Sequence, residues 1–198
     1  MVSGTKQVAR ILYKEIKQGD LLKILARSNK AKSGGGARDF RFGSYKRLLP
    51  VIKKMFPGSI KEIRKRGGKN IQLDVHKGEF FWKDAHGKII RKDSFFESPT
   101  DARGSEGRIA RVPEYACFDT KLIPKGGQGN RVLLLLIQLD DDSVWPHFAE
   151  EKTLRTPGLW DAVVAKEIVT CLDAKRNPSH AAIGYRDFTS TTSYCNGK

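Results

Sequence analysis

The chain has 198 residues and a net charge of +15, because 37 lysines and arginines outnumber 22 acidic residues. Its longest apolar run, VLLLLI, is far shorter than the ~18 residues of a membrane-spanning helix, so we expect no such helix. The hydrophobic fraction of 39% supports a packed core. The basic excess favours a polyanionic partner such as nucleic acid, although a basic surface that only aids solubility remains an alternative.

The positive charge is concentrated in the first part of the chain. Residues 1–111 hold 27 basic and 11 acidic residues, whereas residues 112–198 hold 10 and 11. Residues 23–69 alone hold 15 basic and 2 acidic residues. Such segregation is what a localised binding face requires.

The cysteines and histidines form no recognisable pattern. Cys117, Cys171 and Cys195 are odd in number and widely spaced, without a CxxC motif, and the four histidines lack metal-ligand spacing. We therefore expect no metal, no cofactor, no disulfide framework and a reduced, cytoplasmic protein.

Apolar and basic segments alternate near the start of the chain. Residues 9–16 contain an early apolar patch, and the spacing of the apolar residues in 20–27 fits either a strand or a short helix. The segment RSNKAKSGGGARDFRF (27–42) carries five basic residues, one acid and three consecutive glycines. At its end Phe40 and Phe42 alternate with polar residues, which predicts a short strand.

Residues 44–58 predict a helix. Ser44 can cap it, apolar side chains recur on one side, and Pro57–Gly58 ends it. Because Pro50 suits only a first turn, we expect the regular part to begin near Leu49.

A β-rich region follows. Residues 70–76, 79–84 and 88–93 predict three short strands, with turns at Lys77–Gly78 and at AHGK. Closely spaced strands of this kind favour an antiparallel sheet or small barrel.

The last third predicts one buried strand and one helix. Residues 131–139 are apolar throughout, which is typical of a strand buried on both faces, and residues 157–174 have the apolar stripe of an amphipathic helix. Residues 177–198 are rich in Ser and Thr and read as a C-terminal tail or linker toward a missing domain. The prediction is therefore one mainly β, α+β domain over residues 1–176 with about two flanking helices.

The glycine-rich segment matches neither GxGxxG nor GxxxxGK[ST], so a nucleotide-binding loop is disfavoured. A flexible linker is the main alternative. Arg38 and Arg41 directly after the glycines favour an arm that approaches a phosphate chain closely, because glycine allows that approach and Arg can also read base edges.

A second stretch, DARGSEGRIAR (101–111), places Glu106 among three arginines. Arginine reads guanine and a carboxylate can accept from cytosine, whereas phosphate binding alone gains nothing from Glu106. A surface salt-bridge loop is the alternative. The third basic stretch, KEIRKRGGKN (61–70), fits phosphate positioning and a solvated turn equally.

Signals for an enzyme are weak. Asp119 and Lys121, two apart on a presumed strand, match the short half of a metal-dependent nuclease motif, but the upstream carboxylate would have to be Asp101 or Glu106 in a loop. The motifs GxSxG and HExxH are absent. We expect no catalytic residues in this chain.

The two arm-like stretches resemble the N-terminal effector domain of EcoRII-type restriction endonucleases, a DNA-binding pseudobarrel similar to the plant B3 domain. ILARSNKAKSGGGARDFRF followed by LLPVIKKMFP corresponds to the family's first arm, strand and helix, and RGSEGRIAR corresponds to its second arm. VLLLLIQL stands where the family has a similar apolar strand. The triple glycine departs from the family's mixed sequence, and the second arm is about one residue longer.

The resemblance implies a B3-like open pseudobarrel whose arms grip the major groove of a short, specific site in double-stranded DNA. It also implies a prokaryotic, cytoplasmic restriction-modification protein without membrane contact, with a nuclease domain covalently linked elsewhere. We name Ser28–Arg41 the N-arm and Arg103–Arg111 the C-arm. The predicted DNA-binding residues are Ser28, Asn29, Lys30, Lys32, Ser33, Gly34, Gly35, Gly36, Arg38, Asp39, Arg41, Lys69, Arg103, Ser105, Glu106, Arg108 and Arg111. The subset expected to face bases comprises Arg38, Asp39, Arg103, Glu106 and Arg108.

Two other functions stay open. The charge fits an RNA- or ribosome-associated protein equally well, although most Phe and Trp residues lie on presumed core faces rather than on a stacking surface. A self-contained nuclease that uses Asp119 and Lys121 is the third hypothesis.

Overall fold

The computed structural model describes residues 6–17, 20, 39–66, 68–99, 104–124, 130–174, 177 and 180–197, with only the backbone for residues 64–66, 69 and 120. The strands of these parts are β1 (Val8–Ile16), β2 (Phe40–Phe42), β3 (Gly58–Arg66), β4 (Lys69–Lys83), β5 (Ile89–Glu97), β6 (Gly107–Ile109), β7 (Val132–Leu139), β8 (Val144–Glu150), β9 (Ile183–Asp187) and β10 (Ser193–Cys195). The helices are α2 (Tyr45–Met55), α3 (Glu151–Arg155) and α4 (Ala162–Asp173), with short 3-10 turns η2 (Val112–Glu114), η3 (Ala116–Phe118) and η4 (Thr120–Leu122).

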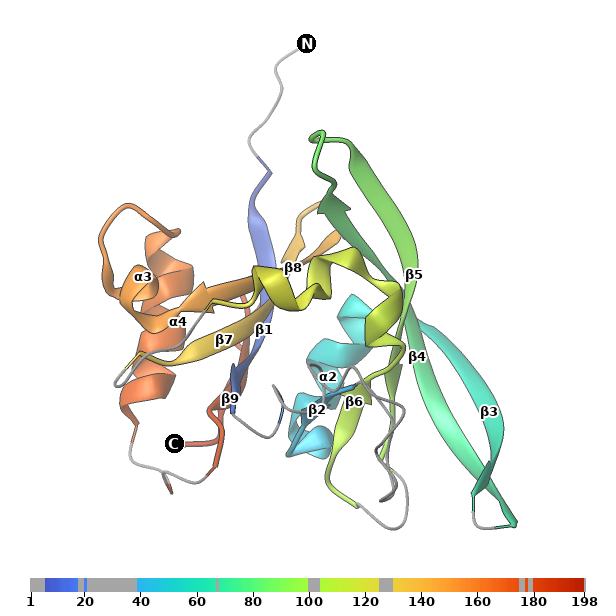
Figure 1. The fold of residues 1–198 in the computed structure, drawn as a ribbon. Coiled ribbons are helices and arrows are strands. Elements are labelled where there is room, and N and C mark those ends of the chain that lie inside the picture. The colour runs from blue at the N-terminus through green and yellow to red at the C-terminus, as the bar shows by residue number, and fades with distance from the viewer. Residues whose placement is uncertain are drawn as a thin grey trace.

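All ten strands belong to one curled, open sheet (Figure 1). Its order is β10-β9-β1-β7-β8-β4-β5-β6-β2, and β3 pairs with β4 off this path. Neighbouring strands are antiparallel except β4 and β8, which meet in parallel at Phe80 and Val144. The predicted α+β, mainly β, open pseudobarrel with flanking helices is thus confirmed.

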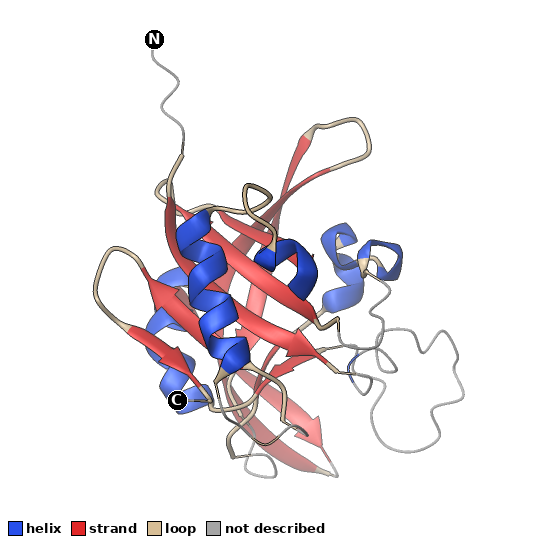
Figure 2. Cartoon of the chain, turned by 90° about the vertical axis from the view of Figure 1, so that its left-hand side faces the viewer, coloured by secondary structure: helices blue, strands red, loops and turns tan. Residues whose placement is uncertain are grey.

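Apolar side chains fill both sides of the central strand β7, as its sequence predicts. Leu134 and Leu136 join the inner cluster, which includes α2, whereas Leu133 and Leu135 join the outer cluster beneath α4. Figure 2 shows α4 lying across the strands on this outer face. No helix among the described residues is long and apolar enough to cross a membrane.

The helix α2 forms where the sequence predicts it, but its start differs. Ser44 has a left-handed backbone (φ 57°) and its side chain makes no capping hydrogen bond. The helix is regular from Tyr45 and contains Pro50 in its interior rather than beginning near Leu49. Tertiary packing of its buried side accounts for this, because Leu48, Val51 and Ile52 are almost fully buried.

The predicted turn at Lys77–Gly78 is wrong, because β4 runs through it without a break. Gly78 serves a close approach between helix and strand instead. A Cβ atom at Gly78 would lie 2.8 Å from the carbonyl oxygen of Met55 at the end of α2. The absent side chain allows α2 to pack directly on β4.

The predicted C-terminal tail or linker is also wrong for most of its length. Strand β9 pairs with β1, and β10 pairs with β9, so residues 183–195 complete one end of the sheet. The expectation that the cysteines take no part in a disulfide is wrong as well. Cys171 of α4 and Cys195 of β10 form one, with their Cα atoms 5.7 Å apart, because packing of α4 on this end of the sheet brings them together.

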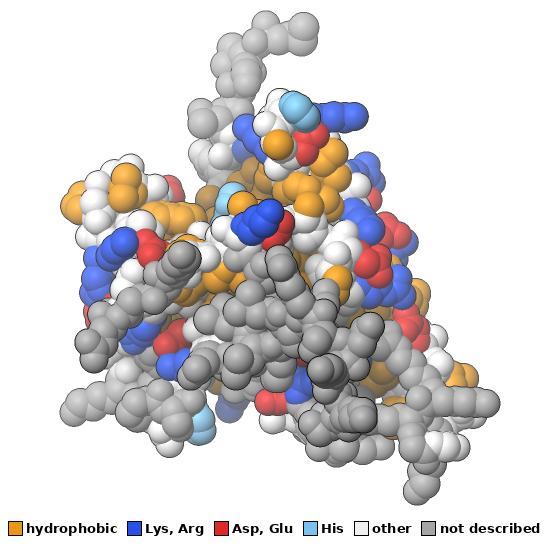
Figure 3. Space-filling view, in the orientation of Figure 1, with side chains coloured by type: hydrophobic (Ala, Val, Ile, Leu, Met, Phe, Trp, Pro, Cys, Tyr) orange, Lys and Arg blue, Asp and Glu red, His pale blue; other side chains and the backbone are white. Residues whose placement is uncertain are grey.

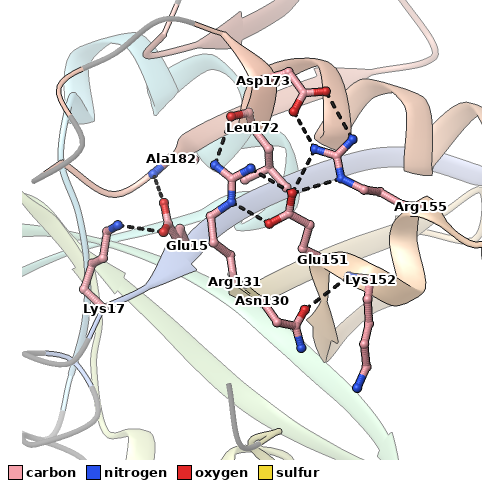
Figure 4. Close-up of polar contacts among 10 residues, drawn as sticks. All are labelled: Glu15, Lys17, Asn130, Arg131, Glu151, Lys152, Arg155, Leu172, Asp173 and Ala182. Atoms are coloured by element: carbon pink, nitrogen blue, oxygen red, sulfur yellow. Dashed lines mark hydrogen bonds and ion pairs between the residues drawn. The ribbon is translucent and has the colours of Figure 1, made fainter. Parts of the chain in front are cut away.

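An ion network fastens α3 and α4 to the sheet (Figure 4). Arg131, beside β7, donates from Nε to Glu151 at 2.6 Å and from Nη1 to the carbonyl oxygen of Leu172 at 2.9 Å. Arg155 donates from Nη2 to Glu151 at 2.8 Å and also pairs with Asp173. The hydrogen bond from Arg131 lowers the pKa of Glu151 to about 2.

Candidate nucleic-acid interface

Strands β2 and β6 join the ends of the two predicted arms. They pair antiparallel, with Arg41 directly opposite Arg108 and Phe40 opposite Ile109. In the sequence the two arms are separated by the long β3–β4–β5 region. The sheet nevertheless brings the last residues of the N-arm and the last residues of the C-arm to one edge.

Alternation along these two short strands decides which side chains face outward. Phe40, Phe42 and Ile109 are fully buried on the inner face, so Arg41 and Arg108 lie on the outer face. The strand pairing therefore stacks two like charges side by side, which requires compensating carboxylates.

Gly107 is needed where β6 begins. A Cβ atom there would come within 2.5 Å of the ring of Tyr45 and within 2.7 Å of the ring of Phe96. The C-arm is also tied to the start of α2, since the backbone N–H of Tyr45 donates to the carbonyl oxygen of Ser105 at 3.0 Å. The root of the C-arm is thus fixed by close backbone packing.

Three carboxylates surround the two arginines, and we call these five residues, Asp39, Arg41, Glu97, Glu106 and Arg108, the arginine–carboxylate cluster. Asp39 accepts from Arg41 Nε at 2.9 Å and from Arg108 Nη1 at 2.9 Å. Glu97 of β5 accepts from Arg108 Nε at 2.6 Å. Glu106 lies 3.8 Å from Arg41 Nη1.

The cluster locks the roots of both arms together. Asp39 and Glu97 are 2% and 1% exposed, and Arg108 directs Nε and both Nη atoms to these two carboxylates. Charge-assisted hydrogen bonds to buried carboxylates are among the stronger side-chain contacts. Within this structure Asp39 therefore positions the arginines rather than facing outward, and Arg108 is engaged by protein groups.

Arg111 links the end of the C-arm to the third basic stretch. Its guanidinium carbon lies 4.0 Å above the centre of the Phe95 ring, and Nη2 is 3.5 Å from Glu62 of β3. Its backbone is left-handed, with a φ of 57°. The third stretch forms the tip of the β3–β4 hairpin, whose turn contains Gly68 at a φ of 76°. In Figure 1 this hairpin and the start of β6 extend toward the same lower end of the molecule.

The other predicted site residues stand as follows. Ser28, Asn29, Lys30, Lys32, Ser33, Gly34, Gly35, Gly36, Arg38 and Arg103 lie outside the described residues, as does the side chain of Lys69. Ser105 and Glu106 are exposed. The sequence reasoning missed Glu97, Glu62 and Phe95, and only the strand register, which a single sequence does not contain, could have linked them to the arms.

The presumed strand for the nuclease hypothesis is absent from the described residues around Asp119. Asp119 follows η3, and Lys121 lies in η4. The backbone N–H of Lys121 donates to Asp119 Oδ1 at 2.9 Å, so the carboxylate closes a local turn. Among the described residues no three His, Cys, Asp or Glu side chains gather in the manner of metal ligands.

No protein-family model, curated protein or solved structure matches this chain.

Proposed function

We propose that this chain is a B3-like domain that recognises a short, specific site in double-stranded DNA, as the recognition part of a restriction endonuclease. The observation that carries the proposal is the pairing of β2 with β6, which joins two basic segments at one edge of the sheet. A solvated basic coat does not require its segments to meet, whereas a two-armed grip does.

The described residues suggest that the roots of the arms and the residues beyond the roots have different roles in DNA binding. The arginine–carboxylate cluster fixes the roots of the arms, and the basic residues beyond the roots neutralise phosphates and read base edges. Fixed roots reduce the conformational entropy that the arms lose on binding. The N-arm glycines let the backbone approach the groove, and the third basic stretch adds phosphate contacts beside the C-arm.

The proposal is tested by titrating duplex DNA at several salt concentrations. Six or more phosphate contacts imply a slope of log K against log salt of about −5. Replacing Lys30, Lys32 and Arg38 by alanine should flatten this slope by about 3, since each phosphate contact contributes about 0.9. The matched control replaces Lys88, Lys121 and Lys166, which are exposed and outside the arms, and should change the slope by less than about 1.

Specificity is tested by selection from random duplexes followed by sequencing. We expect one short motif to be enriched, and its affinity should exceed that of unrelated duplexes by at least ~10³-fold. Equal binding to all duplexes would contradict specific recognition. Stronger binding to single-stranded RNA than to the selected duplex would instead favour the RNA-binding hypothesis.

A further inference from the structure

A large open pocket lies on the side of the molecule that carries the β4–β5 hairpin, apart from the arm roots. Its volume is about 1230 Å³, and its walls come from the β4–β5 hairpin, β7, β8, the η3–η4 turns and the start of α4. Ligand pockets commonly measure roughly 300–1,000 Å³, so this one can hold a drug-sized molecule. Figure 3 shows hydrophobic side chains gathered on the upper part of this face.

Every tryptophan of the chain lines this pocket. The sequence has three, and they are Trp82 of β4, Trp145 of β8 and Trp160 before α4. Three segments that lie far apart in the sequence thus each contribute one indole to the same cavity. Tryptophan has the strongest attraction of the aromatic side chains for a cation above its ring.

Two of these indoles are held in place by their own N–H groups. Trp145 Nε1 donates to Ser143 Oγ at 2.8 Å, and Trp160 Nε1 donates to Thr153 Oγ1 at 3.2 Å. The His147 ring stands nearly perpendicular to that of Trp160, with the ring centres 6.3 Å apart. Desolvation lowers the pKa of His147, which disfavours a positive charge on its ring. The aromatic wall is therefore formed before any ligand arrives.

The pocket is lined by more acidic than basic side chains, whereas the chain as a whole is basic. Three aspartates, Asp84, Asp119 and Asp161, line it beside one lysine, Lys83, although basic residues predominate overall by 37 to 22. Each aspartate is oriented because its Oδ1 atom accepts from backbone N–H groups at 2.9–3.0 Å. An anionic ligand would face three carboxylates, whereas a cation would gain from both the indoles and the carboxylates.

We propose that this pocket binds an apolar organic cation, a quaternary or alkylated ammonium group on an aromatic or aliphatic body. The apolar body contacts the indoles and the aliphatic side chains, and the ammonium group lies over an indole face within reach of the aspartates. The site is independent of the DNA-binding proposal, because it shares no residue with the arms.

The test uses benzyltrimethylammonium and its neutral carbon isostere, neopentylbenzene, with benzenesulfonate as the anionic probe. Because all three tryptophans line the pocket, intrinsic fluorescence and the three indole N–H signals in an NMR spectrum report its occupancy directly. We expect saturable changes with the cation and an affinity at least about fivefold above that of the isostere at low salt. Equal affinity for cation and isostere, preference for the sulfonate, or no saturation by millimolar cation would each overturn the proposal.

Two matched double variants distinguish the effect of the pocket's negative charge from an effect on folding. The double variant Asp84→Asn, Asp119→Asn keeps the Oδ1 acceptors, so its melting temperature should be close to that of the wild type. Its affinity for the cation should fall about tenfold while that for the isostere stays unchanged. The control Asp93→Asn, Asp140→Asn makes the same charge change outside the pocket and should leave both affinities unchanged. If both double variants lost the same affinity for the cation, the effect would come from the net charge of the protein, which would contradict the proposal.

Discussion

Replacing Asp39 by asparagine removes the carboxylate that holds the two arm roots together. The side chain keeps its size and one acceptor oxygen, but it loses its charge and presents an NH2 group to Arg41 or Arg108. Asp39 is 2% exposed, so water does not replace the lost partner fully. The two arginines are partly exposed, which moderates the cost.

The expected loss of unfolding free energy is about 3 kcal/mol. Each charge-assisted hydrogen bond contributes about 1.5–3 kcal/mol, and breaking a buried ion pair costs about 3–5 kcal/mol, with partial exposure favouring the lower end. Urea unfolding measures the change. Asp93→Asn is the control, because its ion pair with Lys77 is half exposed and should contribute only about 0–1 kcal/mol.

The same pair of variants separates two explanations of DNA binding. Both raise the net charge by one, so attraction to phosphate alone predicts slightly tighter binding by each. Positioning of the arms predicts that Asp39→Asn binds more weakly, by about tenfold, while Asp93→Asn does not. Tighter binding by Asp39→Asn, or equal stability losses in the two variants, would refute the reasoning about the cluster.

Three further expectations concern the stability of the fold. Glu151→Gln should lower the unfolding free energy by about 3 kcal/mol at pH 7. In the wild type this contribution is present above pH 4.5 and is lost as the pH falls toward about 2, because the pKa of Glu151 is lower in the folded state than in the unfolded state. Urea unfolding midpoints measured over this pH range test the expectation. Gly78→Ala should cost about 1–3 kcal/mol by overpacking against α2, whereas Gly104→Ala, with open space around it, should change the melting temperature little. Peptide mapping without reductant should recover Cys171 and Cys195 in one cross-linked pair, and reduction should cost roughly 3 kcal/mol for a loop of this length; two free thiols would contradict the pairing.

Elements with a strong local pattern could be predicted from the sequence. The unbroken apolar run of β7, the alternation of Phe40 and Phe42, and the stripe of α4 each reflect burial that a short window already contains. The predictions failed where one residue type serves two purposes. Gly78 suits a turn as well as a close approach, and only the packing of α2 on β4 distinguishes them.

The C-terminal strands and the contacts at the arm roots could not be predicted from the sequence, because they depend on pairing between residues far apart in the chain. Strand β9 is short and lies in a Ser- and Thr-rich context, so its role follows only from its partner β1. Likewise the basic residues of the arms could be recognised by their charge, but nothing in the sequence around Glu97 indicates that it pairs with Arg108 on the neighbouring strand β6. The disulfide belongs to the same class, since Cys171 and Cys195 meet only when α4 packs beside β10.

The position of β1 in the middle of the sheet has a consequence for biosynthesis. This strand leaves the ribosome before both of its neighbours, because β7 and β9 lie at residues 132–139 and 183–187. At about 5–20 residues per second, the second neighbour follows roughly ten to thirty seconds later. Until β7 is made, Ile11, Leu12 and Tyr13, all fully buried in the folded protein, have no strand to pair with, and from then until β9 is made one edge of β1 stays open. The nascent chain therefore carries a strand with an open edge until nearly all of these residues are made, and chaperone protection matters most then.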